Sequence, residues 1–262
     1  MTSLTSRHRV DLAGATRSEW IKFHGLRSNL ILAGFTFALI VANAILMPIA
    51  YVFRDRSSAQ ANYDPYAEMI IDKTGYIGLL LALLAALLIT NEYRSGQIKT
   101  TLLSVPRRTP ALAAKALVIA SVSFLIGVAS AGIGFAIAPA ILAGGGYSYE
   151  LGLSDALRLI LGSGLYLATL SIIGIALGAI IRNVVASVLS TIGLLVIVPI
   201  IPQIFSEYGG EIKRFFPIEA GSLLLGQSTT DSLGPWIGYL ILAIWGLGLV
   251  ALAALLFKRR DA

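Results

Sequence analysis

Six long apolar stretches, separated by shorter polar segments, dominate the pattern of hydrophobic and polar positions in this chain. An apolar helix needs about 20 residues to cross the hydrocarbon core of a bilayer. Five of the stretches reach that length alone, and the second reaches it if its helix begins near Asp72. The pattern therefore predicts an all-α integral membrane fold with six transmembrane helices, at residues 30–53, 76–90, 116–143, 156–181, 184–204 and 236–257.

The composition agrees with a single membrane domain. Apolar residues make up 56% of the chain and charged residues only 13%. No segment between the stretches is long enough to build a second hydrophobic core. We expect residues 1–29 to form a cytoplasmic tail with an interfacial helix, and residues 30–262 to form the six-span domain.

Lys and Arg are concentrated in the amino-terminal tail, in the connections between spans two and three and between spans four and five, and in the carboxyl-terminal tail. Acidic residues favour the other segments. The positive-inside rule places both termini of such a multi-pass protein in the cytoplasm. The basic character then reflects topology, so we expect no nucleic acid as a partner, and some of these residues are expected to contact membrane lipid.

The chain lacks the devices with which many membrane proteins capture energy or perform catalysis. The middle of every span is free of Asp, Glu, Lys and Arg, which argues against a proton or ion relay. There is no G-x-x-x-x-G-K-[ST] phosphate loop and no Cys, and neither His has a carboxylate cluster nearby. The sequence predicts no catalytic residue, cofactor or metal, and a transporter of this kind would take its energy from a partner.

A basic segment that contains Trp precedes the first span. Trp20 and Phe23 are spaced to share one face of a helix, and Lys22 and Arg27 supply positive charge beside them. This combination is typical of an elbow helix that lies in the membrane interface. The other interpretation is a simple positive flank of the first span.

Several positions within and after the spans are candidates for the transport path or its gate. Asn43 in the first span needs a polar partner, either another helix or a substrate. Gly174 and Gly178 allow a close helix approach, which we expect within one subunit rather than between subunits. Span five should break at its prolines, and the apolar segment 205–234 is expected to be re-entrant. The candidates are Asn43, Pro199, Pro202, Phe216, Pro217 and Glu219.

The connection between spans two and three carries a short amphipathic pattern. Ile98, Leu102 and Val105 recur at helical spacing, and Pro106 ends the run. A helix of this kind lies on lipid or inserts into the groove of a partner. A basic connector without a binding role is the remaining interpretation.

This connection resembles that of the ABC-2 type transporter permeases. The family pattern has an acidic residue before a Gly, an apolar pair, a Pro followed by Arg, and a Lys at the next span. The rest of the chain is similar to the small permeases of drug, antibiotic-peptide or bacteriocin-immunity exporters. The matching residues are Glu92, Gly96, Leu102, Leu103, Pro106, Arg108 and Lys115.

The resemblance implies two permease subunits, as a homodimer or heterodimer, in the bacterial plasma (inner) membrane, with two copies of a cytoplasmic ABC ATPase that bind ATP and Mg. The connection would be the coupling helix in the ATPase groove. Arg107 and Arg108 would pair with acidic groove residues or only orient the spans, and Glu92 would contact the partner or favour a helix terminus. The implied coupling residues are Glu92, Arg94, Gly96, Ile98, Leu102, Leu103, Pro106, Arg107, Arg108 and Lys115, and the elbow residues are Trp20, Lys22, Phe23 and Arg27.

The expected substrate is an amphiphilic drug, an antibiotic peptide or a lipid, and the family implies export. Two other functions stay open. A non-transporting scaffold or sensor would have no ATPase partner, whereas a secondary transporter would show intramembrane charge or inverted repeats. An intramembrane enzyme is disfavoured because the serines of the spans have no His or Asp partner there.

Overall fold

The computed structural model describes residues 12–53, 74–96, 108–146, 152–205, 209–226 and 234–259, which are helical apart from short turns and contain no strand. The helices are α1 (Leu12–Gly25), α2 (Arg27–Phe53), α4 (Thr74–Ser95), α6 (Arg108–Gly144), α7 (Leu153–Ile181), α8 (Val184–Ile192), the π-helix η2 (Gly193–Ile197), the 3-10 helix η3 (Val198–Ile200), α9 (Ile201–Phe205), α10 (Gly209–Lys213), α11 (Pro217–Leu224) and α12 (Pro235–Arg259).

The all-α fold with six candidate spans is confirmed. Six helical segments are long and apolar enough to cross a membrane, in the positions that the hydropathy pattern predicts. The short second stretch is completed because α4 runs from Thr74 to Ser95, and α6 extends the third stretch at its amino-terminal side to Arg108. Both helices therefore extend beyond their predicted apolar stretches and include polar residues at their ends.

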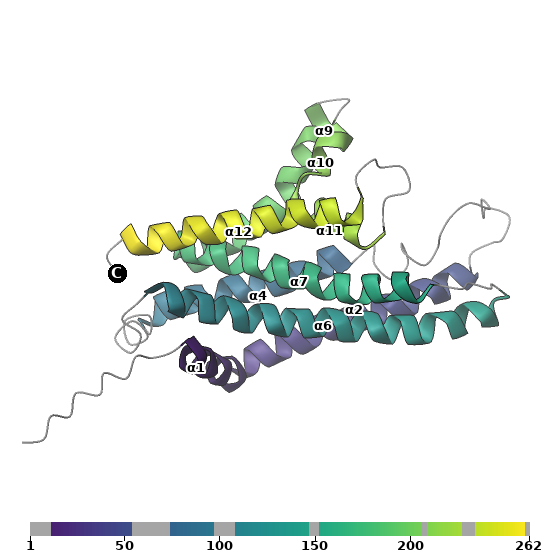
Figure 1. Cartoon of the computed structure of the whole chain (residues 1–262), viewed down its shortest axis with the longest axis horizontal. Coiled ribbons are helices and arrows are strands. Elements are labelled where there is room, and N and C mark those ends of the chain that lie inside the picture. The colour runs from purple at the N-terminus through teal and green to yellow at the C-terminus, as the bar shows by residue number, and fades with distance from the viewer. Residues whose placement is uncertain are drawn as a thin grey trace, which may run out of the picture.

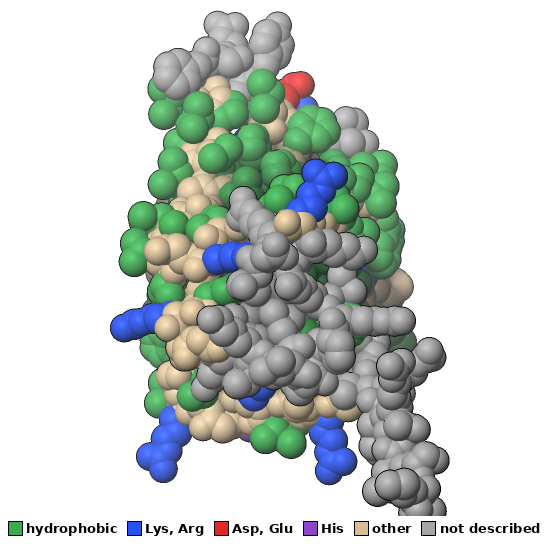
Figure 2. Space-filling view, turned by 90° about the vertical axis from the view of Figure 1, so that its left-hand side faces the viewer, with side chains coloured by type: hydrophobic (Ala, Val, Ile, Leu, Met, Phe, Trp, Pro, Cys, Tyr) green, Lys and Arg blue, Asp and Glu red, His purple; other side chains and the backbone are tan. Residues whose placement is uncertain are grey.

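The long helices α2, α4, α6, α7 and α12 lie side by side in one bundle (Figure 1). At the left-hand end of that view lie α1, the end of α4, the start of α6, the α7–α8 turn and the end of α12. Lys and Arg side chains surround this end (Figure 2), which we call the basic end. Its described basic residues are Arg17, Lys22, Arg27, Arg94, Lys115, Arg182 and Arg259.

Helix α7 is the central element of the bundle. About three quarters of its apolar window (78%) is buried, compared with 17–22% in α2 and α12. It packs against α4, α6, α8, α11 and α12. The remaining faces of the outer helices are apolar and exposed, as expected of surfaces that meet lipid.

The close packing of α4 against α7 depends on two glycines. A Cβ atom at Gly174 would lie 1.9 Å from the carbonyl oxygen of Ala82, and one at Gly178 would lie 2.5 Å from a side-chain carbon of Ile89. The prediction that this glycine pair packs helices within one subunit is confirmed. The absence of side chains at these positions lets the two backbones approach.

Span five differs in detail from the expectation that it breaks at Pro199 and Pro202. The regular α-helix α8 ends earlier, at Ile192. The chain then continues as the π-helix η2 and the 3-10 helix η3 before α9 begins. Pro199 lacks an N–H and its ring crowds the carbonyl four residues earlier, so the backbone widens in the turn before the proline. α9 and α10 project from the side of the bundle (Figure 1).

The segment after span five is anchored to the bundle by α11. Tyr166 of α7 is fully buried and its hydroxyl donates a 3.0 Å hydrogen bond to the carbonyl of Ile218. Gly75 and Gly221 make room for its ring, since a Cβ at either position would lie 2.2 Å from a Tyr166 atom. Packing of α11 on α4, α7 and α12 buries the apolar part of this segment in protein. Its re-entry into the membrane stays a prediction.

Candidate functional site

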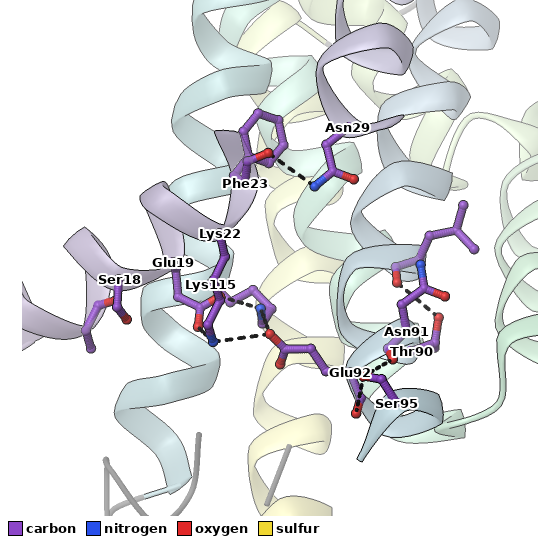
Figure 3. Close-up of polar contacts among 12 residues, drawn as sticks. Ser18, Glu19, Lys22, Phe23, Asn29, Thr90, Asn91, Glu92, Ser95 and Lys115 are labelled. Atoms are coloured by element: carbon purple, nitrogen blue, oxygen red, sulfur yellow. Dashed lines mark hydrogen bonds and ion pairs between the residues drawn. The ribbon is translucent and has the colours of Figure 1, made fainter. Parts of the chain in front are cut away.

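The candidate site lies at the basic end, where α1, the end of α4 and the start of α6 meet (Figure 3). Helix α1 docks here because Ala15 packs on Ala114 of α6 and Phe23 joins the main core. The buried side chain of Asn29 donates a 3.3 Å hydrogen bond to the Phe23 carbonyl and fixes the junction between α1 and α2.

Four charged side chains join these helices in one cluster, which we call the charge cluster: Glu19, Lys22, Glu92 and Lys115. The Lys115 Nζ atom lies 2.8 Å from Glu92 Oε1 and is also hydrogen-bonded to Glu19 Oε2. The Lys22 Nζ atom lies 2.6 Å from Glu19 Oε1 and 3.3 Å from Glu92 Oε1. Each lysine thus bridges both carboxylates, and the cluster links α1, α4 and α6.

Burial makes this arrangement energetically important. Glu19, Glu92 and Lys115 are at most 8% exposed, whereas the Lys22 side chain is 40% exposed. Removing charges from water is costly, and mutual attraction offsets that cost only while every charge keeps its partner. With two carboxylates and two ammonium groups, the charge cluster is formally neutral.

The ion pairs shift the pKa of the two α1 members. Burial by itself would raise the pKa of Glu19, but the charges and hydrogen bonds of Lys115 and Lys22 outweigh it and hold the pKa below 4.5, its ordinary value. Burial would lower the pKa of Lys22, but Glu19 and Glu92 outweigh it and raise the pKa above 10.5. Both groups are therefore held in their charged forms.

Acid is expected to weaken the charge cluster. A depressed carboxyl pKa contributes stability that is present above the ordinary value of 4.5 and is lost as the pH falls through the folded-state pKa. We expect the thermal unfolding temperature in detergent to fall between about pH 5 and pH 3, and to fall less steeply in Glu19→Gln. Equal pH slopes in the two proteins would contradict the assigned role of Glu19.

The predicted elbow residues differ in their burial. Phe23 is buried, whereas Trp20 is 42% exposed and its ring lies 4.3 Å from that of His24. Both rings lie against His24, so Phe23 packs in the core while Trp20 lies at the exposed edge of the same contact. Lys22 belongs to the charge cluster, and Arg27 is the exposed first residue of α2. Contact of α1 with the membrane interface stays a prediction.

Of the predicted coupling residues, Glu92 and Lys115 lie in the charge cluster, where they contact each other and α1. Arg94 is exposed on the last turn of α4, and Gly96 adopts a left-handed backbone (φ +71°) just after it. Such a backbone favours glycine. Arg108 begins α6. Ile98, Leu102, Leu103, Pro106 and Arg107 lie outside the described residues.

The candidate path and gate residues fall into separate places. Phe216 stacks on Trp245 at 6.4 Å between ring centroids, Pro217 begins α11, and Glu219 lies 2.5 Å from the ammonium of Lys213. These residues come together near α11 and α12. Pro199 and Pro202 lie in the η3–α9 turn.

Asn43 lies on α2, which packs against α1, α4 and α6. Its Nδ2 atom is buried and makes no hydrogen bond within the described part of the chain. The structure therefore does not bring Asn43 together with the residues near α11. Its predicted helix-to-helix hydrogen bond is not formed by this nitrogen.

Sequence reasoning assigned no role to Glu19, which the structure places at the centre of the charge cluster. Two signals pointed to it. It is an acidic residue in a basic segment, and it lies four residues before Phe23, on the side of the helix that is buried. Its partner Lys115 is 96 residues away in the chain, so only the fold could identify the pair.

Comparison with known proteins identifies the family. The sequence model of a family described as ABC-2 family transporter protein matches residues 16–200, from α1 to the end of η3. This range includes the charge cluster, the first four candidate spans and most of the fifth. The search of curated proteins found no match. Membership of a transporter family agrees with six apolar helices, and the chain belongs to the ABC-2 transporter family of multi-pass membrane proteins.

Proposed function

We propose that this chain is the membrane-spanning permease subunit of an ATP-driven exporter that couples to a separate cytoplasmic ABC ATPase. Family membership supports the role of permease. The basic end would face the cytoplasm of a bacterial cell, in accordance with the positive-inside rule. ATP and Mg would bind in the ATPase, two copies of which would serve a pair of permease subunits.

The charge cluster is the observation that carries this proposal. Glu92 and Lys115 lie on the two helices that flank the connection 97–107. Lys115 pairs with Glu92 and with Glu19 of α1, and Glu92 also pairs with Lys22 of α1. A force applied to this connection would move α1, α4 and α6 together. Pulling the three helices apart would break the ion pairs of the charge cluster, and leaving such charges without partners is costly. Both α4 and α6 pack on α7, the central helix, so the motion would continue into the bundle.

The substrate would move along the bundle as it rearranges. Residues near α11, including Phe216 and Pro217, are candidates for an outer gate, and the π-helix and proline turn of span five provide an irregular backbone at which that span could bend. An amphiphilic drug, antibiotic peptide or lipid suits the apolar surfaces of the bundle.

The first test is purification of the chain from its native cell in mild detergent, followed by mass spectrometry of the proteins that accompany it. A stoichiometric P-loop ATPase is the expected result. Recovery of this chain without any ATPase under several mild conditions would contradict the proposal and favour a scaffold, a sensor or a secondary transporter.

Replacing Leu103 and Pro106 together by alanine is expected to reduce the amount of co-purified ATPase at least about tenfold, since interface energy is concentrated in a few apolar anchors. Membrane insertion should be unchanged. Leu153→Ala is the control, because Leu153 is 77% exposed on the first turn of α7 at the opposite end of the bundle. Full ATPase recovery and transport in the double variant would show that this connection is not the coupling element.

A further inference from the structure

A cavity of about 490 Å³ lies beside the charge cluster, between the α1–α2 junction, the end of α4 and the start of α6. Its volume is within the range of roughly 300–1,000 Å³ that is typical of small-molecule sites. Gly25, Ser28 and Asn91, which line it, are all exposed residues, so the cavity opens to the outside of the bundle.

One wall of the cavity is polar and its charges balance. Glu19, Lys22, Glu92 and Lys115 all line it, and Lys22 is the most exposed of these side chains. Among the residues that the structure describes, none donates a hydrogen bond to the buried Oε2 atom of Glu92. A buried carboxylate oxygen is costly to leave without a donor, so this wall favours a ligand that brings an N–H donor.

The other wall is apolar and continues onto the outer surface. Phe23, Leu88 and Val118 form it together with Leu26, which is 53% exposed. One turn further along α2, Leu30 and Ile31 are also exposed. An alkyl chain that leaves the cavity past Leu26 would therefore continue along an apolar surface at the start of a candidate membrane span.

We propose that this cavity binds a membrane phospholipid whose head group carries a primary ammonium group. The ammonium donates to Glu92, the phosphate lies near the exposed Lys22, and an acyl chain follows Leu26 out to the lipid. A head group with one positive and one negative charge matches the neutral, two-signed wall. A choline head group has no N–H to donate, and the hydroxyl groups of a glycerol head group donate only as neutral groups, without the positive charge that an ammonium brings to the Glu92 carboxylate. The inference concerns lipid and does not depend on the partner ATPase.

The experiment uses the full chain, purified and delipidated in detergent, and native mass spectrometry after addition of dioleoyl-phosphatidylethanolamine, dioleoyl-phosphatidylcholine or dioleoyl-phosphatidylglycerol. Gly25→Leu is the test variant, since a Cβ at Gly25 would meet no atom within 4 Å and the larger side chain would occupy cavity space. Gly34→Leu is the matched control, because Gly34 also has open space around its Cβ position but lies on α2 away from the cavity. Thermal unfolding of each variant reports whether it is folded.

The expected result is preferential retention of phosphatidylethanolamine, reduced at least about tenfold in Gly25→Leu and unchanged in Gly34→Leu. Equal retention of the three lipids, or equal retention by the folded Gly25→Leu protein, would overturn the proposal. Soluble O-phosphoethanolamine separates the two sources of the head group. If it binds while the intact lipid does not, the ligand is a free amine phosphate and the lipid assignment is wrong.

Discussion

Lys115→Met is expected to destabilise the protein by about 3–5 kcal/mol, because the change removes the buried one of the two lysines that pair with the buried carboxylates of Glu19 and Glu92. The remaining lysine, Lys22, is partly exposed and cannot neutralise two buried carboxylates. The measurement is the free energy of unfolding of the purified protein in mixed micelles. If the chain couples to an ATPase as proposed, that coupling should weaken too, since the charged contacts of α1 with α4 and α6 are reduced.

Two further variants make this expectation specific. Lys22→Met removes the same charge from a side chain that is 40% exposed, so its effect should be smaller. Adding Glu19→Gln to Lys115→Met removes the excess negative charge and leaves Glu92 paired with Lys22, so it should restore part of the lost stability. Equal losses in Lys22→Met and Lys115→Met, or no gain in the double variant, would show that the charge cluster does not hold these helices together.

Gly174→Leu is expected to prevent the normal packing of α4 against α7. The added Cβ would lie 1.9 Å from the Ala82 carbonyl oxygen. This oxygen belongs to the backbone, so it cannot avoid the clash by a change of side-chain rotamer. Overpacking usually costs about 1–3 kcal/mol, and a clash with backbone at the central helix should reach or exceed the upper end of that range. The measurement is the yield of monodisperse protein after detergent extraction.

Gly248→Leu on α12 is the control for Gly174→Leu. Gly248 also lies in an apolar helix, but a Cβ there would meet no atom within 4 Å. Its yield should match that of the unchanged protein. A normal yield of Gly174→Leu would mean that α4 and α7 are less tightly packed than the structure indicates.

Most of the fold could be predicted because its main signal is local. A run of about 20 apolar residues is enough by itself to predict a membrane-spanning helix. Each of the six predicted stretches corresponds to a candidate span. The close approach at Gly174 and Gly178 was also predictable, since the Gly-x-x-x-Gly spacing places both residues on one helix face. Span five was predictable only in part, because the prolines mark the irregularity but not the π-helix that precedes them.

The candidate site was harder to predict. Glu92 and Lys115 were singled out by the family pattern, but that pattern gives no information about the side chains that they contact. Their partners on α1, Glu19 for Lys115 and Lys22 for Glu92, lie on a separate helix whose position depends on the burial of Phe23 and Ala15. The cavity beside them is formed by side chains of α1, α2, α4 and α6. A cavity has no signature in any one of these segments.

The sequence by itself determined the number and approximate limits of the spans and the gathering of basic residues at one end, because hydrophobicity and charge act on each segment independently. The tertiary structure decided that α7 is central, that Phe23 is buried while Trp20 stays exposed, and that four charges from three helices form one neutral cluster. These features depend on packing between helices, where the energy of each side chain is set by neighbours that are remote in the chain.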